Sequence, residues 1–380
     1  MKARGKGAPK HCVTDFDSGT KRKRKPSPQT KLTPDALFDL GVSLMNDKPN
    51  PTEQEKAEAF DYFLNAGEQG HMRAQFQLGM FYHFGVGVEA DDVKSMEWYQ
   101  RAAKQGHPVA LFNLGQMYAE GDLGEKDPKK AAEYYQLAAE KGQVDAMVNL
   151  SSAYRNGRGV EKDIKKSLEY QLSAAEKGHP IALFQIGMLH LEGTEVEKDD
   201  RKAVEYIRLA AEKGHAEAMF NLGLMYGEGF GGIDQDSQRK LECFELAAIG
   251  GSLQAITNLG TMYISGNGVE VDFEKGRAYL QLAAENGVAT AWFNIGMMYF
   301  LGDGEEKDYR KAAEYFQLAA KGGDSNGFFN LGKVYADGIG VAQDTCRAAV
   351  SFKEASALGD REAEQLFQAI VKRSTGLWDE

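Results

Sequence analysis

The sequence predicts an all-α solenoid built from two-helix repeats of about 36 residues. Three observations lead to this prediction: a six-residue segment recurs at nearly constant spacing, a glycine lies eleven residues after each segment begins, and an acidic capping residue precedes a second apolar stretch. The segments begin at Ala74, Ala110, Ala146, Ala182, Ala218, Ala255, Ala291 and Gly327, with 36 residues between successive starts except for 37 after Ala218. A weaker unit begins at Ala36, which makes about nine repeats.

The first helix of each repeat starts at the leading residue of the segment and runs for about ten residues. Ala110, Leu114 and Tyr118 show its apolar stripe at positions i, i+4 and i+8. A glycine that adopts the left-handed conformation commonly ends a helix. The predicted terminal glycines are Gly85, Gly121, Gly157, Gly193, Gly229, Gly266, Gly302 and Gly338.

The second helix is predicted from its capping residues. Asp127 precedes Pro128, a pairing typical of an N-cap followed by the first helical residue. Thr52 and Glu55 form a capping box in the first unit. The same cap position is occupied by Asp163, Asp199, Asp272, Asp308 and Asp344. An alanine pair follows in most repeats, so we expect small residues on both helices to let the hairpin close tightly.

Glycine also recurs inside the first helix, where it costs about 1 kcal/mol relative to alanine. A cost repeated this often predicts a close contact between the two helices of each repeat. The positions are Gly79, Gly115, Gly187, Gly223, Gly260, Gly296 and Gly332, with Ser151 as the departure.

The repeat read from Ala146 to Gly178 resembles the Sel-one-like repeat family, a relative of the tetratricopeptide repeats. The resemblance covers about residues 36–370. It implies a right-handed α-α superhelix with the first helices on its concave side, and adaptor or scaffold roles in protein complexes. One branch of the family has paired cysteines in each hairpin, and the isolated Cys12, Cys243 and Cys346 do not fit that branch.

Charge divides the chain into a basic segment and an acidic body. Residues 1–33 contain ten Lys/Arg and two Asp/Glu, whereas the remainder contains 35 and 54. We predict a disordered basic tail at 1–33, a solenoid with a closing helix at 34–372, and a C-terminal tail at 373–380. An acidic body disfavours nucleic-acid binding. With no long apolar run and no signal sequence, we expect a protein of the cytoplasm, the nucleus or both that is neither secreted nor membrane-bound.

A compact basic cluster lies within the predicted tail. Lys21, Arg22, Lys23, Arg24 and Lys25 precede Pro26 in a segment too polar to fold alone. This composition is typical of a nuclear localisation signal. The alternatives are a solvated tail and a tail that binds the acidic array.

No set of residues indicates catalysis, a cofactor or a metal. His71, His107, His179 and His215 share one position after the second helix, and a whole repeat separates each from the next equivalent position. Packed helices lie about 8–10 Å apart, too far for such histidines to share a zinc ion. We therefore expect these histidines to form turns, and the recurrent aspartates to cap helices.

The predicted binding surface lies on the first helix, opposite its apolar stripe. Positions six, nine and ten after the leading residue face this side, with the recurrent Asn at position three beside them. The Asn side chains are predicted either to bond one repeat to the next or to capture a peptide. The apolar residues are predicted either to bind a partner or to be buried by adjacent repeats. The candidates are Asn113, Asn149, Arg155, Met188, Leu191, Asn221, Asn258, Asn294, Met297, Phe300, Leu301 and Asn330.

The function predicted from these features is a non-catalytic scaffold or adaptor that binds other proteins or peptides. The alternative is a regulatory subunit whose catalytic partner is a separate chain. A monomer is expected, without cofactors.

Overall fold

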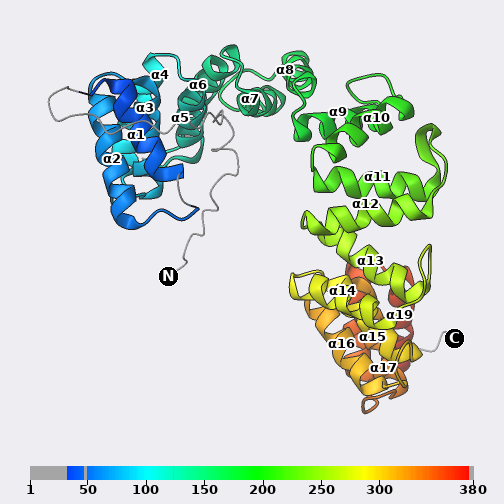
Figure 1. Cartoon of the computed structure of the whole chain (residues 1–380). Coiled ribbons are helices and arrows are strands. Elements are labelled where there is room, and N and C mark those ends of the chain that lie inside the picture. The colour runs from blue at the N-terminus through cyan, green and yellow to red at the C-terminus, as the bar shows by residue number, and fades with distance from the viewer. Residues whose placement is uncertain (1–31, 47–48, 123, 376–380) are drawn as a thin grey trace. The chain divides into compact units, whose positions relative to one another are not determined.

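The computed structural model describes residues 32–46, 49–122 and 124–375. Every regular element in these ranges is a helix, which confirms the predicted all-α class (Figure 1). The described residues form two compact units, one ending at His107 and the other beginning at Pro108. The predicted tails at 1–33 and 373–380 lie largely outside the described residues.

The first unit contains two helical hairpins. Its helices are α1 (Pro34–Asn46), α2 (Glu53–Glu68), α3 (Met72–Phe84) and α4 (Asp92–Lys104). Phe38, Phe63 and Phe81 form the centre of its core. The predicted capping box at α2 is present: Thr52 Oγ1 accepts the Glu55 backbone N–H, and the Glu55 carboxylate accepts the Thr52 backbone N–H at 2.8 Å.

The second unit continues the same alternation of first and second helices. Its helices are α5 (Pro108–Glu120), α6 (Pro128–Glu140), α7 (Val144–Asn156), α8 (Ile164–Glu176), α9 (Pro180–Glu192), α10 (Asp200–Glu212), α11 (Ala216–Glu228), α12 (Ser237–Ile249), α13 (Leu253–Ser265), α14 (Phe273–Glu285), α15 (Ala289–Leu301), α16 (Tyr309–Lys321), α17 (Ser325–Asp337), α18 (Thr345–Ala357) and the closing helix α19 (Arg361–Thr375). A short 3-10 turn, η1 (Phe230–Gly232), lies in the one longer repeat and packs against α10.

Helix ends follow the sequence signals. Gly85, with φ of 67°, ends α3 in the left-handed conformation, and its N–H bonds the Phe81 carbonyl. The predicted aspartates cap the second helices: Asp127, for example, accepts the Lys130 backbone N–H at 3.0 Å. The local part of the prediction is therefore confirmed, because each signal acts within a few residues of the helix end.

The glycines inside the first helices lie against large side chains of the second helices. A Cβ added at Gly296 would lie 2.8 Å from the Phe316 ring, and one at Gly79 would lie 2.4 Å from the Tyr99 ring. The close contact is thus confirmed, but the residue opposite the glycine is bulky, whereas we had expected small residues on both sides. The other pairs are Gly115 with Tyr135, Gly187 with Ile207, Gly223 with Phe244, Gly260 with Leu280 and Gly332 with Phe352.

The exception at Ser151 is matched by a change across the hairpin. Gln171 of α8 occupies the position that holds a bulky apolar residue in the other repeats of this unit. Ser151 Oγ instead lies 3.0 Å from Ser167 Oγ, and all three side chains are buried. A polar contact therefore replaces the contact of glycine with a large side chain.

Replacing Gly296 with alanine is expected to destabilise the protein. The added methyl must displace the buried Phe316 ring, and overpacking of this kind costs about 1–3 kcal/mol. Alanine is the better helix former by about 1 kcal/mol, which offsets only part of that cost. Urea denaturation followed by circular dichroism measures the change in unfolding free energy. Gly227→Ala in α11 is the control, because the added methyl there meets only the flexible Lys240 side chain. A Gly296→Ala protein as stable as the wild type would contradict the packing argument.

Candidate functional site

The candidate surface consists of the outward residues of the first helices, at positions six, nine and ten after the leading residue. In the second unit several of these residues are exposed and chemically different. Position six is Ser152 in α7, Leu224 in α11 and Lys333 in α17, and all three are exposed. The sixth position is half-buried in the other four repeats of this unit, so it faces solvent fully in three of the seven.

The apolar candidates of α15 do not share one environment. Met297 and Phe300 are half-buried and pack against a core cluster. The Phe300 ring meets Tyr309 edge-on at 5.2 Å and also contacts Phe316. Leu301 is 50% exposed. Met297 and Phe300 are therefore partly covered by their neighbours, and Leu301 is the apolar group of α15 that is most available to a ligand.

A similar division holds for the other apolar candidates of this unit. Met188 and Leu191 on α9 are half-buried. Leu224 on α11 is 37% exposed, although it was not among the residues selected from the sequence. The exposed apolar area at the selected positions is thus smaller than expected, and Leu224 and Leu301 are the exposed large apolar residues at positions six and ten.

The recurrent asparagines are all half-buried. Asn221, Asn258 and Asn330 donate side-chain N–H groups to carbonyls four residues earlier in their own helices, at 2.8–2.9 Å. These three bonds do not link repeats, so the predicted inter-repeat ladder is wrong for them. Asn149 differs, because it bonds the side chain of Tyr135 on the preceding helix. Asn113 and Asn294 lie at the same helical position of α5 and α15.

Arg155 on α7 is occupied by an ion pair with the next repeat. Its guanidinium binds both oxygens of Glu195, with Nη2 at 2.9 Å from Oε2, and also reaches Gln171 at 3.2 Å. Glu195 lies two residues after Gly193, where five other repeats of this unit have glycine. The ion pair links two repeats. It also neutralises the charge of Arg155, which borders the candidate surface.

The four aligned histidines act as turn residues, as predicted. His71, His179 and His215 each cap the following helix, with Nδ1 accepting a backbone N–H. The imidazoles also join repeats: His71 stacks on Phe38 and His215 stacks on Phe184. Capping through Nδ1 requires that this nitrogen carry no proton.

The repeat geometry agrees with comparison to known proteins. A family model described as Sel1 repeat matches nine segments: 34–71, 73–107, 108–143, 144–179, 180–215, 216–252, 253–288, 290–324 and 329–360. The chain belongs to the Sel1 repeat family. The nine matched segments coincide with the hairpins described above, including the weak first unit.

Two solved Sel1-type structures resemble this one. An Escherichia coli protein, described as a protective antigen of uropathogenic strains displaying an SLR fold, is 31% identical with a TM-score of 0.75; the match covers 90% of this chain and 72% of that one. A Sel1 repeat protein from Oxalobacter formigenes is 29% identical with a TM-score of 0.59, covering 91% and 97%. A comparison with curated proteins finds no match. These likenesses support the family and the solenoid fold.

The Sel1 repeats also expose a feature that the sequence analysis missed. The tenth residue of the second helix is an exposed leucine in five repeats: Leu137, Leu209, Leu246, Leu282 and Leu318. Each of these leucines directly precedes an alanine pair that carries the packing signal. Aligning the repeats and marking exposed apolar residues in each column would have found these leucines.

The described residues of this Sel1 array show little that indicates chemistry. They contain no group of three metal-ligating side chains and no helix able to span a membrane. Burial raises the pKa of Cys243 to about 11, which makes its thiolate scarce at neutral pH. The basic cluster Lys21–Lys25 lies outside the described residues.

Stability is expected to fall in mild acid because of two histidines. Burial, with the nearby charge of Arg73, lowers the pKa of His107 to about 4, and burial lowers the pKa of His215. In the unfolded chain both titrate near 6.5. The stabilisation from the neutral histidines is therefore complete above pH 6.5 and is lost as the pH falls. For His107 the loss continues until the pH reaches about 4. The loss at His107 is on the order of 1–2 kcal/mol after allowing for partial exposure.

Thermal melts between pH 7.5 and 4 measure this effect. Serine caps the equivalent position at Ser252 without titrating, so His107→Ser with His215→Ser is the matched variant. The variant should lose less stability than the wild type on acidification, because both proteins contain the same carboxylates and their contribution cancels in the comparison. Parallel pH dependence of the two proteins would contradict the assignment.

Proposed function

We propose that this chain is a non-catalytic scaffold or adaptor that binds a partner protein through the outward residues of its first helices. Membership of the Sel1 repeat family supports this, because the family generally consists of protein-interaction scaffolds. The partner is a protein or a peptide segment, and no cofactor is required.

The observation that carries the proposal is the contrast between fixed and variable positions. The packing residues recur in most repeats, whereas the sixth position changes from Ser152 to Leu224 to Lys333 in the three repeats of the second unit where it is exposed. Stability alone would be satisfied by one polar helix former at this position in every repeat. Different chemistry in each repeat gives a surface that can discriminate between partners.

The alternative is a regulatory subunit of a separate enzyme. Both functions use protein binding and differ in what is bound. A purification that yields one enzyme in constant ratio favours the regulatory subunit. Several proteins in variable amounts favour the scaffold.

Replacing two exposed apolar residues on the outward side of the first helices, Leu224 and Leu301, tests the surface. Leu224→Ser with Leu301→Ser should reduce the recovery of bound proteins at least several-fold, because a partner then loses apolar contact area. The melting temperature should hardly change, because both side chains are already exposed. Quantitative mass spectrometry after affinity purification gives the readout.

Met297→Ser is the contrasting variant, since Met297 packs against the core and its loss should lower the melting temperature. Undiminished recovery of partners by the Leu224/Leu301 variant would remove the first helices from the binding surface.

We further propose that the chain acts in the cytoplasm, the nucleus or both, and that Lys21–Lys25 directs nuclear import. The support is the density of basic residues ahead of Pro26. A fluorescent fusion should concentrate in the nucleus, and changing the five residues to alanine should spread it through the cell. An unchanged distribution would exclude this cluster as the import signal.

A further inference from the structure

The second helices present an apolar surface separate from the candidate site on the first helices. Four successive repeats place a leucine at the tenth residue of the second helix: Leu209, Leu246, Leu282 and Leu318 on α10, α12, α14 and α16. These side chains are between 37% and 52% exposed. Ile249, one turn beyond Leu246, is 84% exposed. We call these five residues the leucine ridge.

The fold does not require leucine at this position. Equivalent helices carry Arg101 in α4, Ser173 in α8 and Glu354 in α18. Arginine and glutamate form helices about as well as leucine does. The alanine pair that follows provides the packing: Ala210 and Ala211 are buried, whereas Leu209 before them is exposed. The leucines therefore add an exposed apolar group without helping the helices to form.

Stacking places the ridge residues on successive neighbouring repeats of the second unit. Helices α10 to α17 contact one another in chain order, so equivalent positions of successive repeats follow one another along one continuous, gradually rotating face of the array. Ser173 precedes the ridge and Glu354 follows it, so polar residues mark both ends. Apolar groups repeated over several neighbouring elements mark an interaction surface more often than single exposed leucines do.

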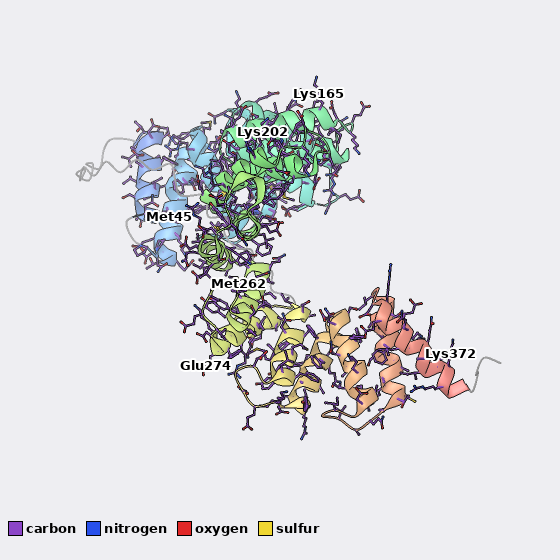
Figure 2. The ribbon with its side chains drawn as sticks, turned by 90° about the vertical axis from the view of Figure 1, so that its right-hand side faces the viewer. Met45, Lys165, Lys202, Met262, Glu274 and Lys372 are labelled. Atoms are coloured by element: carbon purple, nitrogen blue, oxygen red, sulfur yellow. The ribbon has the colours of Figure 1, made fainter. Side chains whose placement is uncertain are left out.

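The charge around the ridge identifies the kind of partner. Helix α10 contains three acidic and three basic residues, α12 and α14 contain two of each, and α16 contains one acidic and three basic residues, so the four helices together are close to neutral. In contrast, the four loops at 193–199, 229–236, 266–272 and 302–308 contain eleven acidic and two basic residues. Glu274, at the start of α14, is exposed and lies at the edge of the array in Figure 2. The ridge thus lies on the electrically balanced part of an acidic array.

We propose that the leucine ridge is the contact surface between two copies of this chain. A second copy carries apolar groups at the same repeat spacing, so one ridge can match the other over several repeats. Balanced charge on the second helices lets two acidic arrays approach there without the repulsion that their loops would cause. A two-fold contact uses the same patch on both copies, as this proposal requires.

Self-association through the ridge uses the second helices only. The outward residues of the first helices are left free, so a dimer would present two copies of the surface proposed to bind partners. The inference does not depend on that proposed function, since it concerns different residues. It replaces the monomer expected from the sequence.

Sedimentation velocity of the full chain over a hundredfold concentration range tests the proposal. The wild type should shift from the mass of one chain to that of two, and the shift should persist in high salt because the contact is mainly apolar. The variant Leu209→Gln, Leu246→Gln, Leu282→Gln, Leu318→Gln should remain a monomer with unchanged helicity. A wild type that stays monomeric throughout would overturn the proposal, as would a folded quadruple variant that still dimerises.

Two further variants keep the test decisive. Gln281→Ala and Gln317→Ala alter exposed neighbours of the ridge on α14 and α16 and should leave dimerisation unchanged. If the quadruple variant fails to fold, Leu282→Gln alone should raise the dimer dissociation constant about tenfold or more, because a two-fold contact loses the leucine twice. An unchanged dissociation constant for that single variant would count against the ridge.

Discussion

The contact between a first-helix glycine and a bulky second-helix side chain is the constraint on which the array depends. At Gly296 the Phe316 ring occupies the space that a Cβ would fill, and the same arrangement recurs from repeat to repeat. Glycine weakens the helix by about 1 kcal/mol, but it lets a large ring or branched chain pack directly against the backbone. The spacing within the hairpin is fixed by this contact. That spacing in turn places the alanine pair of the second helix against the next repeat.

Sequence patterns predicted the fold because its signals are local or periodic. Asp127 and Gly85 act within one turn of the helix end, so their roles could be inferred without knowing the packing. The partner of Gly296 could not be inferred in the same way, because Phe316 lies twenty residues away on another helix. The close approach was therefore predicted, whereas the bulky residue opposite the glycine was not.

The candidate site was predicted less completely for a related reason. A helical wheel describes one isolated helix, so it placed Met297 and Phe300 on the open side without the neighbouring side chains that partly cover them. It also left Arg155 free, because Glu195 lies forty residues further along the chain. Leu301 was located correctly, because it lies near the end of its helix and has fewer neighbours to cover it.

The residue that caps the first helix differs in chemical type from repeat to repeat. The residue before the first helix is His71, His179 or His215 in some repeats and Ser252 or Asp324 in others, and each side chain accepts a backbone N–H of the following helix. Histidine adds a ring that can stack on the preceding repeat, as His215 does on Phe184. It does so at the cost of a cap that works only while Nδ1 is unprotonated. The cap is thus common to the repeats, whereas sensitivity to acid belongs to particular joints.

The residues that depart from the repeat pattern in the middle of the second unit form hydrogen bonds with one another. Ser151 contacts Ser167, Arg155 joins Gln171 to Glu195, and Gln171 donates to Gln185 at 3.0 Å. A buried polar group is tolerated when it is bonded and costly when it loses its partner. Exchanging this hairpin with a neighbour would separate Arg155 from Glu195 and Gln171 from Gln185, although most of its packing residues would still fit. The glycine contacts make the repeats alike, and this polar network gives two adjacent repeats a fixed order in the array.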